Sequence, residues 1–257
     1  MSLSACRCLS NVSPLTLAFA AGATALNRMN AHMNADIHDY LAPGDLIDSD
    51  HADIQTFARD RAGDGDDRQR AVRLYYAVRD EIRYDPYKFS LDPVHLRASA
   101  TLAAGSGYCV PKAGLLAACA RAAGIPARIG LADVKNHLAS QRLVALMQTD
   151  IFYYHGYTEL WLDGRWVKAT PVFNIELCKR FGVKALEFDG SEDALMHDFD
   201  TAGRRHMQYL ADHGPRADLP LAELEAVYRK HYPRLLAALD ELRGDMGVEI
   251  EQERAQG

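Results

Sequence analysis

The feature that most constrains the fold is an apolar stretch at residues 110–123, VPKAGLLAACARAA. Its apolar side chains recur at helical spacing and cover a broad face. Gly124 and Pro126 then end the helix. A helix with so wide an apolar face has to be covered by other elements, so we expect it to be largely buried.

The segments after this helix have the character of strands. Residues 125–134, IPARIGLADV, predict one strand, and residues 152–173 predict two strands joined at Asp163 and Gly164. Before it, residues 67–84 have the spacing of an amphipathic helix. A helical first half that leads into an antiparallel sheet is an α+β pattern, with the 110–123 helix packed on the sheet.

The remaining elements are shorter. We expect a helix and two strands in the segment that follows the hairpin, and one or two helices near the C-terminus that break near Pro233. These lie at residues 174–182, 185–190, 206–210 and 219–244. The expected organisation is an N-terminal extension at residues 1–33, one domain at 34–245 and a frayed tail at 246–257.

Charge and cysteine content narrow the partners and the compartment. The net charge is −6, whereas a nucleic-acid backbone or an anionic membrane requires a basic face, so we expect neither as a partner. Five scattered cysteines leave at least one thiol unpaired and favour the cytoplasm. The apolar residues 15–26 leave export through a signal sequence as the alternative.

Cys109 stands at the start of the 110–123 helix, after a turn that contains Gly105 and Gly107. A free thiol is mostly protonated at neutral pH, so a nucleophilic cysteine needs a group that favours the thiolate. The N–H groups and positive dipole end of a helix N-terminus provide one. They could also bind an oxyanion.

His155 is the candidate base for this thiol. It lies on a predicted strand in the aromatic run FYYHGY. Glu159 and Trp161 follow at even spacing and so share its face of the strand. An imidazole in this place could take the thiol proton near neutral pH.

Together these segments resemble a known family. GYCVPKAGLLAACARAAGIPARIG followed by HGYTELWLDGRWVKATP resembles the transglutaminase-like superfamily of papain-type folds. More narrowly, GYCVPKA and KATPVFN resemble a bacterial branch that is described as cysteine proteases. The resemblance implies a family core at about residues 68–190, a peptide or protein amide substrate, and neither a metal nor a cofactor.

Carried over onto this sequence, the resemblance makes Cys109 the nucleophile and His155 the general base and acid. The third position of the family motif is an aspartate before a proline, but here it is Thr170. A threonine hydroxyl can orient the imidazole but carries no charge to stabilise imidazolium. Asn174, or an aspartate from elsewhere such as Asp189 or Asp198, could take this place instead.

Further residues are candidates for binding the substrate because they precede the nucleophile, end a neighbouring strand or share the face of His155. They are Tyr108, His137, Glu159, Trp161 and Asn174.

Two other classes of function stay open. A non-catalytic binding module could keep the fold and the cleft. Thr170, which stands in place of the family's aspartate, favours this reading. A structural metal protein would use Cys109, His137 and His155 with a fourth ligand. Within the enzyme hypothesis, the motif does not separate water from an amine as the acceptor of the acyl group.

Overall fold

The computed structural model describes residues 37–256. The chain divides into two units after His38, and the elements below belong to the second unit, Asp39–Gly257. The predicted extension at residues 1–33, with its apolar stretch at 15–26, lies outside the described residues. Among the residues that are described, no helix is long and apolar enough to cross a bilayer.

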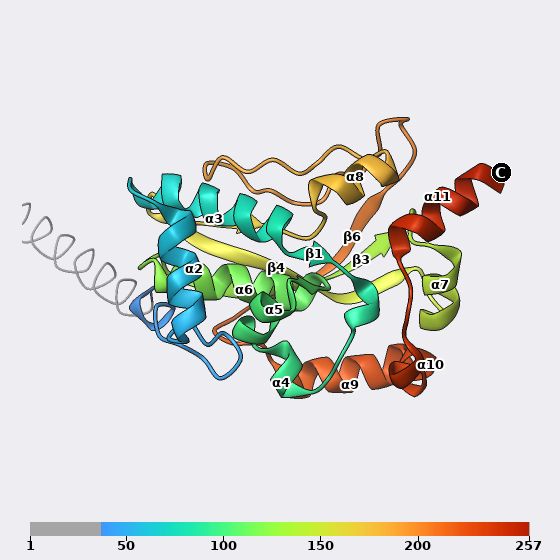
Figure 1. Ribbon diagram of the computed structural model, residues 1–257, viewed down its shortest axis with the longest axis horizontal. Helices are drawn as coiled ribbons and strands as arrows, with labels where there is room; N and C mark the ends of the chain where they lie inside the picture. Colours follow the sequence, from blue (N-terminus) through green and yellow to red (C-terminus); the bar gives the residue numbers. More distant parts are fainter. Residues whose placement is uncertain (1–36, 257) are drawn as a thin grey trace, which may run out of the picture. The chain divides into compact units, whose positions relative to one another are not determined.

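Helices dominate both ends of the second unit, and a sheet occupies its middle (Figure 1). The helical elements are α2 (Ala52–Ala62), α3 (Asp67–Glu81), η1 (Pro86–Lys88), α4 (Pro93–Leu96), α5 (Ala98–Ala104), α6 (Cys109–Ala122), α7 (Gln141–Met147), α8 (Ile175–Phe181), α9 (Leu221–His231), α10 (Pro233–Ala237), η2 (Leu239–Glu241) and α11 (Met246–Gln256). The strands are β1 (Arg83–Tyr84), β2 (Ser106–Gly107), β3 (Ala127–Asn136), β4 (Ile151–Leu162), β5 (Arg165–Ala169) and β6 (Met207–Arg216).

The main sheet has four strands in the order β5-β4-β3-β6, and every neighbouring pair in it is antiparallel. The turn between β4 and β5 is the predicted one. Asp163 and Gly164 both have positive φ, 49° and 83°, as a two-residue type I′ hairpin turn requires. The short strands β1 and β2 form a separate parallel pair.

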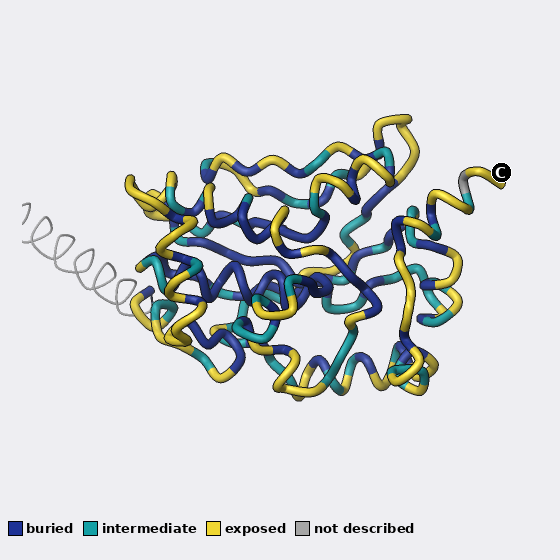
Figure 2. The backbone as a smooth tube through the Cα atoms, in the orientation of Figure 1, coloured by how far each residue is buried: buried dark blue, intermediate teal, exposed yellow. Residues whose placement is uncertain are grey.

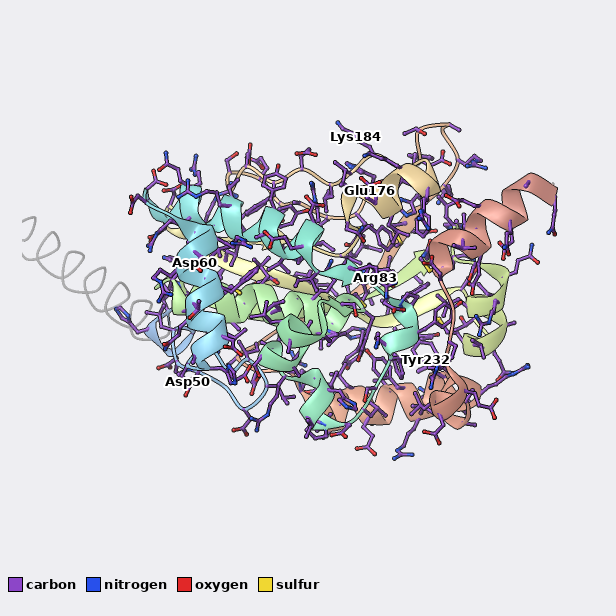
Figure 3. All side chains as sticks on the ribbon, in the orientation of Figure 1. Asp50, Asp60, Arg83, Glu176, Lys184 and Tyr232 are labelled. Atoms are coloured by element: carbon purple, nitrogen blue, oxygen red, sulfur yellow. The ribbon has the colours of Figure 1, made fainter. Side chains whose placement is uncertain are left out.

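Helix α6 forms the centre of the unit and confirms the prediction of a buried helix. Every residue from Cys109 to Arg121 is buried, and the helix contacts β3 and β4 as well as α2, α3 and α5 (Figure 2). Charged side chains such as Asp60 and Lys184 lie on the outside, whereas Tyr232 is buried (Figure 3). This α+β arrangement of a helix on an antiparallel sheet is the predicted fold class.

A buried lysine ties α6 to the end of α3. The Lys112 ammonium donates to the backbone carbonyls of Arg79, at 3.0 Å, and of Ile82. These carbonyls lie at the C-terminus of α3, where the helix dipole favours positive charge. Burial nevertheless lowers the pKa of Lys112 to about 7. The contact fixes one side of α6 within one turn of Cys109.

The strand predicted at residues 185–190 is absent, and this prediction was wrong. Side chains of α3 take the place of a neighbouring strand there. The carbonyl of Leu186 accepts from the Tyr75 hydroxyl at 2.9 Å and from Arg79 at 2.8 Å. The N–H of Phe188 donates to the Tyr76 hydroxyl at 3.2 Å. Because these backbone groups already have hydrogen-bond partners, the segment does not need to pair with another strand.

The C-terminal tail, which we expected to fray, forms helix α11. Met246 and Ile250 are buried, and the Glu249 carboxylate accepts hydrogen bonds from Ser140 and Arg142, each at 2.8 Å. The polar composition of the tail concealed the two apolar residues that anchor it. Helix α11 thereby braces the start of α7.

Candidate active site

The short elements that directly precede Cys109 set its position. Helix α5 ends at Gly105, whose φ of 58° is left-handed, a conformation that glycine adopts without strain. Strand β2 then pairs with β1, and Tyr108 takes an extended backbone immediately before α6. Cys109 is thus the first residue of a long buried helix, as the sequence predicts.

Strand β4 touches this helix at Gly156, the residue after His155. The backbone N–H groups of Gly156, of Val110 and of Cys109 itself act on the Cys109 thiol and lower its pKa. A Cβ on Gly156 would lie 2.8 Å from the Val110 Cα, which is closer than real contacts allow. Thr158 adds a second link, because its hydroxyl donates to the Ala113 carbonyl at 2.8 Å.

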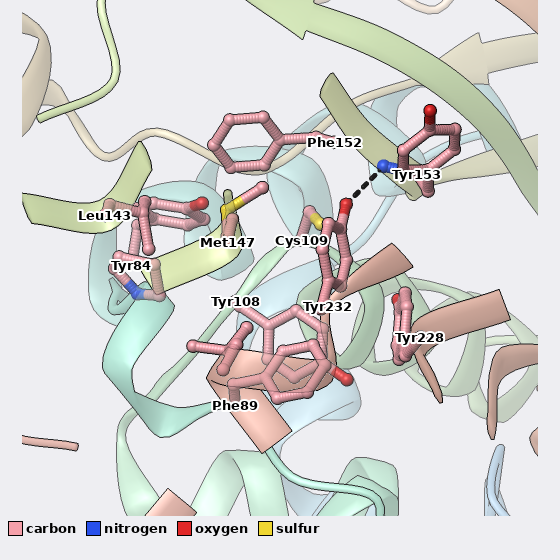
Figure 4. A pocket seen from close by; sticks show the side chains of 12 residues that line it. Tyr84, Phe89, Tyr108, Cys109, Leu143, Met147, Phe152, Tyr153, Tyr228 and Tyr232 are labelled. Carbon is pink, nitrogen blue, oxygen red and sulfur yellow. Dashed lines mark hydrogen bonds between the residues drawn. The ribbon is translucent and has the colours of Figure 1, made fainter. Parts of the chain in front are cut away.

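The sulfur opens onto a pocket of about 390 Å³ between α6, β4, α7 and the C-terminal helices (Figure 4). Cys109 itself is only 5% exposed. The pocket is lined by Tyr84, Pro86, Phe89, Tyr108, Cys109, Leu143, Met147, Phe152, Tyr153, Tyr228, Tyr232 and Leu235. Most of these side chains are aromatic, and none of them carries a charge at neutral pH.

Burial controls the ionisation of the thiol. Removal from water raises the pKa of Cys109 to about 11, although the three backbone N–H groups act to lower it. The N–H groups at the helix N-terminus favour the thiolate, as expected, but burial outweighs them. The dipole acts through a few N–H groups, whereas burial removes the whole hydration of the anion.

His155 is 2% exposed, and burial lowers its pKa to about 4. Its Nδ1 has no hydrogen-bond partner among the described residues, and the same holds for the Thr170 hydroxyl. The predicted hydrogen bond from the imidazole to Thr170 is therefore not formed. At neutral pH Cys109 is therefore a thiol and His155 an uncharged imidazole.

A β-bulge directly precedes His155. The register of β3 with β4 shifts between Ala132 and Val134, and Tyr154 has a φ of 57°, which is unusual for a residue with a side chain. The Asp133 carboxylate holds the bulge by accepting from the Tyr154 N–H at 3.1 Å. At a bulge, side chains no longer alternate strictly between the two faces of the sheet. Two consecutive residues of β4, Phe152 and Tyr153, both line the pocket.

Of the five predicted substrate-binding residues, only Tyr108 lines this pocket. Two others lie further along β4 toward its hairpin turn. Glu159 forms an ion pair with Arg128, at 2.5 Å, and Trp161 packs edge-on against Trp166 with ring centroids 5.3 Å apart. Their side chains serve strand packing.

The remaining predicted residues are engaged elsewhere. His137 is exposed, and its N–H donates to the carbonyl of His206 at 2.8 Å. Asn174 precedes α8, and its side-chain oxygen accepts from the Tyr84 N–H at 3.2 Å. Asp189 and Asp198 are exposed, and neither they nor Asn174 forms a hydrogen bond with His155 among the described residues.

Several residues at the site were not predicted. Tyr232 is one of them, and its hydroxyl accepts from the Tyr153 N–H at 2.5 Å and donates to the Ile151 carbonyl at 3.0 Å. Gly156 could have been found, because an isolated glycine within a strand pattern signals a close approach of another backbone. No local sequence pattern predicts that α9 contributes to the pocket.

Comparison with known proteins finds a family that part of the chain matches. Residues 55–171 match the transglutaminase-like superfamily, a range that contains Cys109, His155 and Thr170 and starts earlier than the predicted core. Among curated proteins, none matches this chain.

Two solved structures are similar to the chain at low identity. One, from Cytophaga hutchinsonii, is described as a "putative cysteine protease"; it has 17% identity and a TM-score of 0.41, with 70% of this chain and 54% of that chain covered. The other, from Parabacteroides distasonis, is described as a "putative protease"; it has 17% identity and a TM-score of 0.34, with 46% and 23% covered. This chain thus spans about half of the first protein and less than a quarter of the second.

Proposed function

We propose that this chain, whose residues 55–171 match the transglutaminase-like superfamily, cleaves or exchanges amide bonds through a thioester on Cys109. The observation that carries the proposal is the environment of the sulfur. It lies at the start of α6, three backbone N–H groups act to lower the pKa of its thiol, and Cys109 lines a pocket. A structural thiol needs neither the donors nor the pocket.

The reaction begins with both Cys109 and His155 uncharged. As the Cys109 sulfur attacks the carbonyl carbon, the thiol proton moves to the His155 imidazole. The carbonyl oxygen becomes an oxyanion close to the N–H groups that surround the sulfur. His155 then returns the proton to the departing amine, and a thioester remains on Cys109.

The second half of the reaction restores the enzyme. Water or another amine attacks the thioester carbonyl, His155 takes a proton from this nucleophile, and the sulfur leaves and regains the proton. With water the product is a carboxylic acid, and with an amine it is a new amide. We propose hydrolysis as the main reaction because water needs no second binding site.

The test is turnover of small chromogenic amides by the full chain and by matched cysteine variants. Cys109→Ala should abolish turnover, and His155→Ala should reduce it at least a hundredfold. Cys119→Ala is the control because Cys119 is fully buried in the same helix and does not line the pocket. Turnover by Cys109→Ala at the wild-type rate would refute the proposal.

A binding module without catalysis is the second candidate. The unpartnered His155 Nδ1 and Thr170 hydroxyl favour it, because an efficient triad would join these groups. It predicts that amides bind equally well to wild type and Cys109→Ala and that neither variant turns them over. For a structural metal protein, the described residues contain no group of three or more His, Cys, Asp or Glu side chains arranged to hold an ion.

A further inference from the structure

The side chains that line the Cys109 pocket determine which kind of acyl group can bind there. On the pocket floor lie Tyr108 and Phe89, with ring centroids 5.2 Å apart, and Phe89 also packs against Tyr228 at 4.9 Å. Opposite them, Met147 and Phe152 close the pocket (Figure 4). The surface next to the sulfur is therefore a continuous layer of rings and aliphatic groups.

The polar side-chain atoms of the pocket are five tyrosine hydroxyls and the thiol, and two of the hydroxyls are occupied as follows. The Tyr232 hydroxyl is held by backbone groups of Tyr153 and Ile151. The Tyr108 hydroxyl donates to the Ser90 carbonyl at 3.4 Å. Tyr84 is 5% exposed, and within the described part of the chain no hydrogen bond is formed by its hydroxyl, which remains available to a ligand.

This lining discriminates strongly between side chains. A carboxylate or ammonium group would lose its hydration without meeting an opposite charge, and a carboxamide would leave most of its donors and acceptors unpaired. An aromatic ring or large aliphatic group would instead exchange water for apolar contact. The lining thus favours an uncharged apolar side chain over a polar or charged one.

We propose that the acyl donor of this enzyme carries an uncharged aromatic or large aliphatic side chain next to the attacked carbonyl, and that this side chain occupies the Cys109 pocket. The inference rests on the proposed function, since it identifies the substrate class of the same site. It selects against glutamine and charged residues at the acyl position. A phenol ring at this position would also be able to pair with the Tyr84 hydroxyl.

The test separates binding from catalysis. Three compounds are titrated by NMR into the full-length Cys109→Ala chain: N-acetyl-phenylalaninamide, N-acetyl-glutaminamide and the α-amide of N-acetyl-aspartic acid, which keeps a charged side-chain carboxylate. Turnover of the matching anilides is measured on wild type. The proposal predicts that the phenylalanine compound binds at least tenfold more tightly than the other two and that kcat/KM follows the same order.

A pocket variant gives a second, independent measurement. Met147→Lys places an ammonium group among the rings, so it should weaken phenylalanine binding and raise the relative affinity of the aspartate compound. Should this variant not fold, the three ligands on the parent chain still decide the question. Leu236→Lys is a control for an added lysine because Leu236, on α10, does not line the pocket.

The outcomes distinguish the two claims. Turnover that depends on Cys109 but shows no preference for the phenylalanine compound would overturn the inference and leave the proposed function intact. Selective phenylalanine binding without any turnover would support the pocket assignment and refute the proposed function. Equal binding of all three compounds, or tighter binding of the aspartate compound, would overturn the inference whatever the turnover.

Discussion

The backbone of Gly156 packs directly against Cys109, and this close approach joins β4 to the first residue of α6. The contact requires the absence of a side chain at residue 156, because a Cβ there would overlap the Val110 Cα at 2.8 Å. Since His155 is the preceding residue, the same contact sets the position of the imidazole along the helix. The geometry of the site therefore depends on one glycine.

Gly156→Ala should separate β4 from the start of α6. We expect the free energy of unfolding to fall by about 1–3 kcal/mol, as for other overpacked sites, and turnover to be lost because the N–H moves away from the sulfur. Urea unfolding and anilide turnover measure the two effects. Gly114→Ala is the control: its Cβ would meet only Leu219 at an ordinary 3.4 Å. Equal stability and activity of both variants would contradict the close contact.

Alkylation of Cys109 should depend steeply on pH. Because burial raises the pKa of its thiol to about 11, the thiolate fraction and the rate with iodoacetamide should rise about tenfold per pH unit between pH 7 and 9. Mass spectrometry of the tryptic peptides follows each cysteine separately. Cys119, which is fully buried away from the pocket, should stay unmodified in the folded protein. A plateau at neutral pH would show that the thiol is already ionised.

Acid should destabilise the fold through its buried histidines. Burial lowers the pKa of His155 and of His206 to about 4, below the ordinary 6.5. Between these values the unfolded chain binds protons that the folded chain does not, so stability is lost as the pH falls from 6.5 to 4. The loss should reach roughly 2–3 kcal/mol for each histidine.

Urea unfolding at pH 7.5 and pH 4.5 measures this dependence. His155→Asn, which does not titrate, should remove the contribution of His155, whereas His95→Asn should leave the dependence unchanged because His95 is exposed. An unaltered pH dependence in His155→Asn would indicate that the imidazole is already protonated in the folded state above pH 6.

Thr170 allows a direct test of what orients the imidazole. Its hydroxyl is buried without a hydrogen-bond partner, so Thr170→Val should raise the free energy of unfolding by about 1 kcal/mol and leave turnover within twofold. Thr170→Ser is the control that keeps the hydroxyl. A large loss of turnover in Thr170→Val, restored in Thr170→Ser, would show that the hydroxyl holds His155 during the reaction.

The parts of the fold that the sequence predicted are those with a local signal. The apolar residues of α6 and the Asp163–Gly164 turn each occupy a few consecutive positions, so spacing and turn chemistry identify them. The motifs around Cys109 and His155 are local as well, so the sequence identified both residues and their order along the chain. The predicted strand at 185–190 failed because side chains of α3, distant in sequence, satisfy its backbone.

The parts that were missed depend on contacts between distant segments or on burial. Tyr84, Phe152 and Tyr232 meet in one pocket although about 70 to 80 residues separate each from the next along the chain, and no local pattern relates them. The sequence did not predict the bulge at Tyr154, because its positive φ occurs at a tyrosine and not at a glycine or asparagine. The raised pKa of Cys109 follows from burial, whereas the sequence showed only the helix N-terminus that opposes it.

The central claim, that Cys109 carries the acyl group, is tested most directly by mass spectrometry of the protein during turnover. Wild type is mixed with an N-acetyl-phenylalanine anilide or activated ester, quenched in acid and digested. The account predicts that the added mass of the acyl group appears on the peptide containing Cys109, at a level that rises and decays with turnover, and is absent in Cys109→Ala. Turnover with no acyl group on Cys109, or the same adduct on another residue, would contradict it.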